Sequence, residues 1–141
     1  NDYKVDNVVL NPQNPLEIIG VLDWEMATIG DPLMDLGSSL AYWIDRDDPK
    51  EYHHMRMLPT TEPGMLTRKQ VVQRYAARMG IEVAKFDFYL CFGFFRLAVI
   101  AQQIYYRFYH GQTKDKRFEM LIFAVALLEK AALELISQSD L

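Results

Sequence analysis

The sequence predicts a mainly helical chain with one short β-hairpin near its N-terminus. After residue 31, apolar residues recur at helical spacing and are flanked by helix-capping signals. Before that point, runs of β-branched and aliphatic residues are separated by a turn rich in proline and asparagine. The chain has 141 residues, of which 50% are hydrophobic. We therefore assign residues 1–141 to a single globular domain.

The hairpin is the first predicted element. Its strands are Val8–Leu10 and Leu16–Leu22, and Asn11–Pro15 between them favours a turn because proline and asparagine break helices. A helix is then predicted over residues 32–44. Asp31 is its N-cap, and a proline occupies the first helical position, where its missing N–H costs nothing.

Residues 45–66 are predicted to be a long loop, because three prolines and a glycine interrupt them without any sustained period. Loops of this length inside a domain are usually binding loops or flexible segments. Thr67 and Gln70 then form a capping box, which begins a helix that ends at Gly80.

Two longer helices complete the chain, over residues 86–110 and 116–138. The first contains a largely apolar stretch, Phe88–Tyr106, that is long enough to be considered as a membrane span, but Arg96 lies at its centre. A charged side chain is costly in the hydrocarbon core of a bilayer. We interpret the stretch as the buried central helix of the domain, and we expect no insertion into a membrane.

Charge and cysteine content narrow the class of function. Residues 1–51 sum to −8 and the remaining residues to +4, which gives the net charge of −4. So dense a set of carboxylates repels nucleic acid, and we expect no nucleic-acid partner. The single cysteine, Cys91, excludes an internal disulfide and favours a reducing, cytoplasmic location.

Acidic residues near the N-terminus form a pattern suited to phosphoryl transfer. Asp2 is followed five residues later by Asn7, then by the predicted hairpin, and then by Asp23 at the end of the second strand. In kinase-like folds one carboxylate accepts the proton of a substrate hydroxyl, while an amide oxygen and a second carboxylate hold Mg²⁺. Because the hairpin brings the two segments together, the order of these residues is more informative than any one of them.

Simpler explanations exist for most of these residues. Asp2 can be a solvated acid, Asn7 a turn residue before a strand, Asp31 an N-cap, and Asp35 an acid favoured by the dipole of the first helical turn. Asp23 differs because it lies between two large apolar residues. A carboxylate buried there requires a partner, such as Mg²⁺ or a backbone donor.

The segment Asp2–Asn7, together with the run Val21–Leu36 and its Gly-Asp-Pro-Leu-Met-Asp-Leu sequence, resembles the aminoglycoside phosphotransferase and choline kinase-like family. The closest likeness is to the branch whose phosphotransferase domain is sometimes fused to acyl-CoA dehydrogenases. The resemblance implies the C-terminal lobe of a protein-kinase-like fold. It also implies the roles of catalytic base for Asp2, Mg²⁺ ligands for Asn7 and Asp23, and structural supports of the catalytic loop for Asp31 and Asp35.

Two features depart from the family pattern. The family's catalytic loop usually reads His-Gly-Asp, whereas this sequence reads Asn1-Asp2. The seven glycines never cluster into a phosphate-covering loop, and no lysine on a strand can be assigned to the α- and β-phosphates. We therefore expect the chain to represent the C-terminal lobe of a longer kinase, without its nucleotide lobe, and to be inactive alone.

The leading hypothesis is an ATP- and Mg²⁺-dependent small-molecule kinase that transfers the γ-phosphoryl group to a substrate hydroxyl. The alternative is a noncatalytic, kinase-derived helical interaction domain. A metal-dependent hydrolase is disfavoured, because no histidine or third carboxylate has an interpretable metal-ligand spacing. The surface on which a nucleotide lobe would dock should be apolar, and it should favour a homo-oligomer when uncovered.

Overall fold

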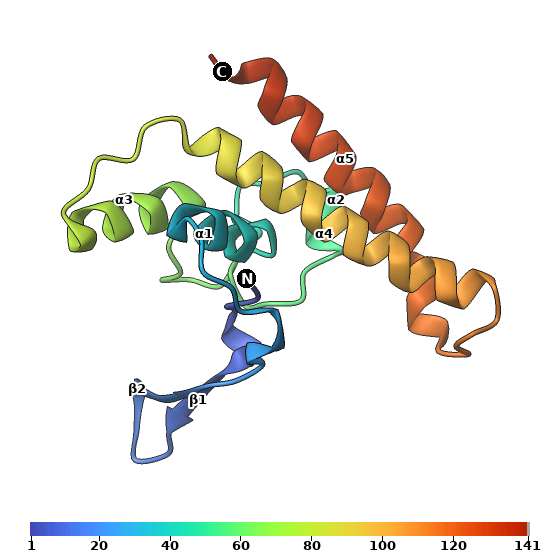
Figure 1. The fold of residues 1–141 in the computed structure, drawn as a ribbon, viewed down its shortest axis with the longest axis horizontal. Coiled ribbons are helices and arrows are strands. Elements are labelled where there is room, and N and C mark those ends of the chain that lie inside the picture. The colour runs from blue at the N-terminus through green and yellow to red at the C-terminus, as the bar shows by residue number, and fades with distance from the viewer. Residues whose placement is uncertain (141) are drawn as a thin grey trace.

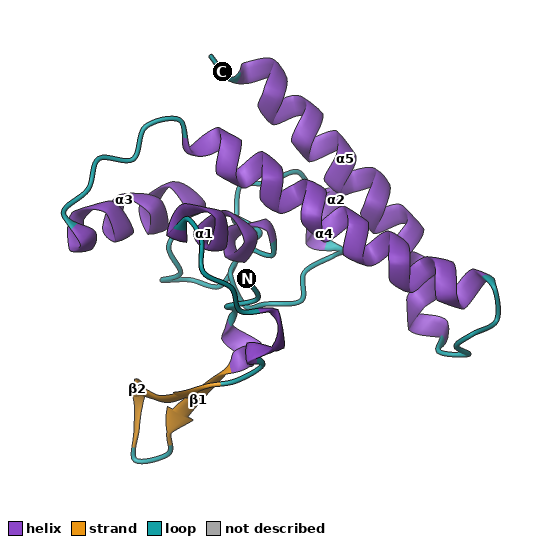
Figure 2. Cartoon of the chain, in the orientation of Figure 1, coloured by secondary structure: helices purple, strands orange, loops and turns teal. Residues whose placement is uncertain are grey.

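The computed structural model describes residues 1–140 and has the predicted class, mainly helical with one antiparallel hairpin. Figure 1 shows the hairpin projecting from a body of helices, and Figure 2 shows that the strands drawn in the described chain are those of the hairpin. The short 3-10 turns are η1 (Val5–Asn7), η2 (Trp24–Met26) and η3 (Lys116–Met120). The helices are α1 (Pro32–Ala41), α2 (Lys50–His53), α3 (Arg68–Met79), α4 (Phe86–Tyr109) and α5 (Leu121–Gln138).

The hairpin consists of β1 (Val8–Asn11) and β2 (Asn14–Val21), and its turn is tighter than predicted. Asn11 pairs with Asn14, so that only residues 12 and 13 form the turn instead of the predicted 11–15. The side-chain Oδ1 of Asn11 accepts a hydrogen bond of 3.0 Å from the backbone nitrogen of Gln13, which closes the turn locally. Pro15 therefore lies inside β2, in a stretch where the pairing is irregular.

The helices differ from prediction mainly at their ends. α1 ends at Ala41 rather than at residue 44, and α2 occupies part of the predicted loop 45–66. The predicted helix 116–138 begins with the 3-10 turn η3, and Asp115 caps this turn by accepting a hydrogen bond from the backbone amide of Arg117. The capping box at the start of α3 is confirmed, with Thr67 and Gln70 each accepting a hydrogen bond from the other's backbone amide.

The core lies where α4 packs between α1 and α5. Figure 1 shows α5 running alongside α4. Ala41, Phe94 and Leu128 form its buried centre, one residue from each helix. The backbones of α1 and α4 approach closely because glycines face each other. A Cβ atom on Gly37 would collide with the carbonyl oxygen of Tyr89, and one on Gly93 would collide with the carbonyl oxygen of Gly37.

The expectation that α4 is buried on all sides is wrong. Only 17% of its most apolar 18-residue window is buried, although by length and composition it is the one helix of residues 1–140 that could cross a membrane. Gly93 and Ala101 are buried, whereas Phe95 is 63% exposed and Tyr109 is 71% exposed. The helices α1 and α5 each contact one face of α4. Apolar side chains on the other faces of α4 therefore stay exposed.

The segment 45–66 is anchored rather than free. Arg68 donates two hydrogen bonds to the carboxylate of Asp48, at 2.5 and 3.0 Å, and its Nε donates to the backbone oxygen of Trp43 at 2.8 Å. The buried hydroxyl of Thr60 donates to the backbone oxygen of Ile44 at 2.8 Å and accepts from its nitrogen at 3.1 Å. These bonds tie the segment to the residues that follow α1 and to the first residue of α3.

Candidate active site

The loop before β1 brings Asp2 and Asn7 together. The 3-10 turn η1 closes with a hydrogen bond of 2.9 Å from the backbone nitrogen of Asn7 to the oxygen of Lys4. The chain thereby turns back, and Nδ2 of Asn7 donates to the backbone oxygen of Asp2 at 2.8 Å and to its Oδ2 at 3.0 Å. The spacing of five residues that the sequence analysis singled out is therefore a direct side-chain contact.

The carboxylate of Asp2 is held by three side-chain donors. Besides Asn7, Nζ of Lys4 donates to Oδ2 at 2.8 Å, and the hydroxyl of Tyr42 donates to Oδ1 at 3.2 Å. An ionised carboxylate has about four lone-pair positions. One position therefore stays free to accept a hydrogen bond from a further hydroxyl.

These donors keep Asp2 in its charged form. Burial alone would raise the pKa of Asp2, but the hydrogen bond and charge of Lys4, together with the hydrogen bonds from Asn7 and Tyr42, bring that pKa below its ordinary value of 3.8. At neutral pH the residue is a carboxylate fixed in one orientation. Such a group can accept a proton without first losing one.

Tyr42 stays protonated beside this carboxylate. Its burial, followed by the charge of Asp2 and the hydrogen bond to it, raises the pKa of Tyr42 to about 12, and the charge of Arg96 opposes this rise. The ammonium of Lys4 also lies over the Tyr42 ring, 4.8 Å from its centroid. The phenol is therefore a permanent hydrogen-bond donor to Asp2 over the physiological pH range.

Asn7 links this loop to the second strand. It is buried, with 9% of its surface exposed, and its backbone oxygen accepts a hydrogen bond of 2.8 Å from the nitrogen of Leu22. This bond extends the pairing of the two strands by one step, so that Asp23 follows directly after the residue that pairs with Asn7. Because Nδ2 of Asn7 is used by Asp2, the amide oxygen is the atom left to bind a cation.

The surroundings of Asp23 differ from the prediction. The two large apolar neighbours do not bury it, because Leu22 is 55% exposed and Trp24 is 67% exposed, and Asp23 is itself exposed. Its backbone has φ 61° and ψ 55°, a left-handed conformation that costs energy for any residue with a Cβ. The argument from burial is thus wrong, and local backbone strain takes its place as the distinctive feature.

Asp31 and Asp35 serve α1 in different ways. Oδ1 of Asp31 accepts a hydrogen bond of 2.8 Å from the nitrogen of Leu33, which confirms the predicted N-cap, and Oδ2 accepts one of 3.0 Å from the hydroxyl of Tyr89 on α4. Asp35 lies in the first turn of α1, and its Oδ1 is 2.6 Å from the terminal ammonium of Asn1. A bracing role for Asp35 stays a prediction.

The donor set suits a hard divalent cation that keeps several of its waters. Asn7 and Asp23 offer one amide and one carboxylate, which are oxygen ligands of the kind Mg²⁺ accepts alongside substrate phosphates. Within residues 1–140 there is no cluster of three or more histidine, cysteine or acidic residues of the kind that forms an all-protein metal cage. The residues therefore fit a site that is completed by water and substrate.

Three residues of this site were not identified from the sequence. Lys4 and Tyr42 contact Asp2. Arg96 of α4 lies close enough for its charge to oppose the rise in the pKa of Tyr42, and its Nη2 is 3.7 Å from the sulfur of Met26. A lone arginine in an apolar helix was the available signal for the last of these. Tyr42 lies 40 residues from Asp2 in sequence, and no local pattern marks it.

Comparisons with known proteins agree with this geometry. Residues 1–58 match the family described as "Phosphotransferase enzyme family". A crystal structure described as that of an aminoglycoside phosphotransferase from Ralstonia eutropha superposes with a TM-score of 0.80 at 26% identity, over 99% of this chain and 42% of the other.

Curated relatives include larger proteins named for a different activity. Acyl-CoA dehydrogenase family member 10 of Mus musculus is 36% identical over 116 residues, which is 81% of this chain and 11% of the relative. Acyl-CoA dehydrogenase family member 11 of Rattus norvegicus is 32% identical over 137 residues, which is 95% of this chain and 17% of the relative. The chain thus spans less than a fifth of these relatives. Residues 1–58 therefore match the phosphotransferase enzyme family, and the fold of the chain is similar to the kinase-like fold of an aminoglycoside phosphotransferase.

Proposed function

We propose that the chain is the catalytic-loop part of an ATP- and Mg²⁺-dependent kinase that phosphorylates a hydroxyl group of a small molecule. One observation carries this proposal, the charged Asp2 carboxylate that three donors orient and that keeps one free acceptor position. The family match of residues 1–58 and the likeness to an aminoglycoside phosphotransferase support phosphotransfer as the reaction class.

In this proposal Asp2 accepts the proton of the acceptor hydroxyl. Lys4, Asn7 and Tyr42 hold its carboxylate in place, so that little reorganisation is needed when the hydroxyl arrives. Asn7 and Asp23 would hold Mg²⁺, which when bound neutralises phosphate charge and orients the transferring group. Lys4, which pairs with Asp2, and Arg96 of α4, whose charge acts on Tyr42, are cations close to this acidic site, and they favour the approach of an anionic phosphate.

We further propose that efficient transfer needs residues beyond these 141. The sequence offers no glycine-rich loop to cover phosphates and no assignable strand lysine. The related crystal structure is also more than twice as long as its match to this chain, which covers 42% of it. Transfer depends on positioning and charge neutralisation, so the 141 residues alone should phosphorylate no acceptor at a measurable rate.

The test measures release of the γ-phosphoryl group from ATP, with Mg²⁺ and a panel of hydroxylated acceptors, in the natural gene product that contains these residues. We expect Asp2→Asn to lower kcat by roughly 10²- to 10⁴-fold, the usual contribution of a positioned base. Asp6→Asn is the matched control, an exposed acid on the same loop that is not assigned to the site. Equal activity of the Asp2→Asn and parent enzymes would contradict the proposal.

A second candidate is a noncatalytic interaction domain. The exposed apolar residues of the hairpin region favour it, since Leu16 is 96% exposed and Ile29 is completely exposed. Absence of Mg²⁺-dependent ATP binding by the natural gene product, together with an intact fold, would support this candidate over the kinase.

A further inference from the structure

A cavity that Asp2 does not line lies between the end of α1, the segment that contains α2, and the helices α4 and α5. Its volume is about 270 Å³. Its walls are mainly aliphatic and include Met55, Leu90, Leu97, Leu121, Leu128 and Leu135. An apolar cavity of about 150 Å³ is already sufficient to bind benzene, so this one accommodates a larger molecule.

The charged residues of the cavity wall already have partners. Arg68 donates two hydrogen bonds to Asp48, whereas the half-exposed Glu134 lies 3.9 Å from the ammonium of Lys130, whose closer partner is Glu51. A charged ligand would have to break one of these pairs or enter an apolar space without a counter-ion. Both are unfavourable, and the cavity therefore selects against ions.

One polar group in the wall has no partner. Tyr52 of α2 is 8% exposed, and within residues 1–140 its buried hydroxyl makes no hydrogen bond. Burial, together with the negative charge of Glu134, raises the pKa of Tyr52, so that its hydroxyl keeps its proton. A buried hydroxyl without a partner costs free energy, and a ligand with a hydrogen-bonding group would recover that cost.

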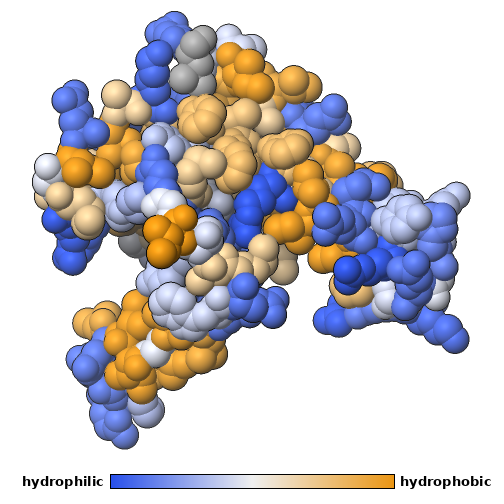
Figure 3. Space-filling view, in the orientation of Figure 1, coloured by the Kyte–Doolittle hydropathy of each residue, from blue (hydrophilic) through white to orange (hydrophobic). Residues whose placement is uncertain are grey.

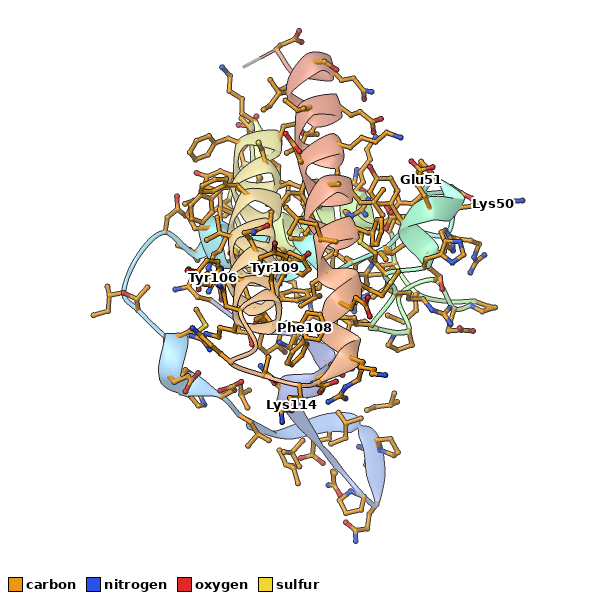
Figure 4. All side chains as sticks on the ribbon, turned by 90° about the vertical axis from the view of Figure 1, so that its right-hand side faces the viewer. Lys50, Glu51, Tyr106, Phe108, Tyr109 and Lys114 are labelled. Carbon is orange, nitrogen blue, oxygen red and sulfur yellow. The ribbon has the colours of Figure 1, made fainter. Side chains whose placement is uncertain are left out.

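The wall that carries Tyr52 is held in place. Figure 4 shows α2, labelled at Lys50 and Glu51, beside the helix α5. Nζ of Lys130 on α5 is 2.5 Å from Oε1 of Glu51, and this surface ion pair joins α2 to α5. Together with the pairing of Arg68 and Asp48, it keeps the cavity formed.

We propose that this cavity is a binding site for an uncharged, largely apolar small molecule whose polar group hydrogen-bonds to the Tyr52 hydroxyl. Tyr42, whose hydroxyl holds Asp2, also lines the cavity, so that the occupant and the catalytic loop share one side chain. The proposal does not depend on phosphoryl transfer, because the experiment measures binding to the natural gene product that contains these residues and measures no turnover.

The experiment compares three probes with the same alkyl chain, namely 1-octanol, octylammonium and octanoate, by calorimetry and by methyl chemical shifts. We expect saturable binding of 1-octanol with a stoichiometry of one, and affinities at least tenfold lower for the two ions. The methyl groups of Leu97 and Leu128 should shift, whereas that of the exposed Leu16 should not.

Two variants make the test specific. Tyr52→Phe keeps the ring and removes the hydroxyl, and it should weaken 1-octanol binding by roughly fivefold while Tm stays equal or rises. Tyr109→Phe is the matched control on the exposed end of α4 and should change neither quantity. Binding that does not saturate, shifts confined to Leu16, an ion that binds as tightly as 1-octanol, or equal affinity in Tyr52→Phe would each overturn the proposal.

Discussion

At the residue scale, the two acids that we propose for the site are held in different ways. Asp2 is fixed by donors that surround its carboxylate, and these lower its pKa. Asp23 is exposed and is instead defined by its backbone, which is left-handed at φ 61°. The donors to Asp2 can be removed one at a time by substitution. The backbone conformation at residue 23 depends instead on which residue occupies that position. The two acids therefore call for different substitutions.

For Asp2, removing the ammonium of Lys4 should raise the pKa of the carboxylate. In Lys4→Met the burial that opposes ionisation remains, while the largest lowering influence is lost. Titration of the Asp2 carboxyl carbon by NMR should show a higher pKa in Lys4→Met than in the parent chain, and Lys4→Arg should stay close to the parent. An unchanged pKa in Lys4→Met would show that Asn7 and Tyr42 are sufficient.

The Asp2 carboxylate also contributes to the free energy of unfolding in a way that depends on pH in the acidic range. Because the pKa of Asp2 in the folded chain lies below 3.8, folding favours its charged form. Its stabilising contribution is complete above pH 3.8 and is lost as the pH falls through the lower folded pKa. Urea unfolding at pH 2 and pH 5 should therefore show a smaller pH-dependent loss in Asp2→Asn than in the parent chain.

For Asp23, stability and activity should separate. Asp23→Gly removes the cost of a left-handed conformation, so the free energy of unfolding should not fall by more than about 1 kcal/mol, the entropic cost of a glycine. In the natural gene product, both Asp23→Gly and Asp23→Asn should lower kcat by orders of magnitude and alter its Mg²⁺ dependence. A collapse of folding in these variants, or full activity at saturating ATP, would make Asp23 a structural residue.

The sequence predicted those site residues whose signal is local. The spacing of Asp2 and Asn7 is closed by a single 3-10 turn, and Asp31 precedes a proline at a helix start. Tyr42 could not be predicted because its contact with Asp2 arises from tertiary packing across 40 residues. The exposure of Asp23 was also missed, since the apolar character of its neighbours does not determine whether they are covered.

At the element scale, the crossing of α1 and α4 depends on two small residues rather than on large apolar ones. Gly37 and Gly93 let the two backbones approach until a Cβ atom on either would meet a carbonyl oxygen of the other helix. This crossing also positions residues of the candidate site, because Asp35 lies on α1 and Tyr42 directly follows the last residue of that helix. Helical periodicity predicted both helices but not their closeness, which depends on how the glycines align in space.

We predict that Gly37→Ala separates these helices. Alanine favours a helix by about 1 kcal/mol over glycine, yet the collision with the backbone of Tyr89 should lower the free energy of unfolding by a net ~1–3 kcal/mol. Gly30→Ala is the control, because a Cβ atom there has nothing within 4 Å. If urea denaturation shows Gly37→Ala to be as stable as Gly30→Ala, the close approach is absent in solution.

At the scale of the whole molecule, the hairpin carries much exposed apolar surface, and Figure 3 shows it as a mainly orange projection from the body. Leu16 is 96% exposed and Ile19 is 56% exposed, and both strands are edge strands whose backbone groups can pair with another chain. The strongly negative charge of residues 1–51 lies in the same part of the chain and opposes association only over short distances in salt. An uncovered hairpin should therefore bind a second copy of itself.

We predict that the 141-residue chain self-associates through this hairpin. Sedimentation velocity over a range of concentrations should show a dimer or larger species. Leu16→Lys combined with Ile19→Lys should raise the dissociation constant at least about tenfold, because the burial of two aliphatic side chains contributes more than about 1.4 kcal/mol.

Leu133→Lys combined with Ile136→Lys is the matched control on α5, where the two residues are 59% and 55% exposed. That control should associate like the parent chain. A parent chain that stays monomeric at high concentration, or loss of association in the α5 variant alone, would show that the hairpin is not the contact.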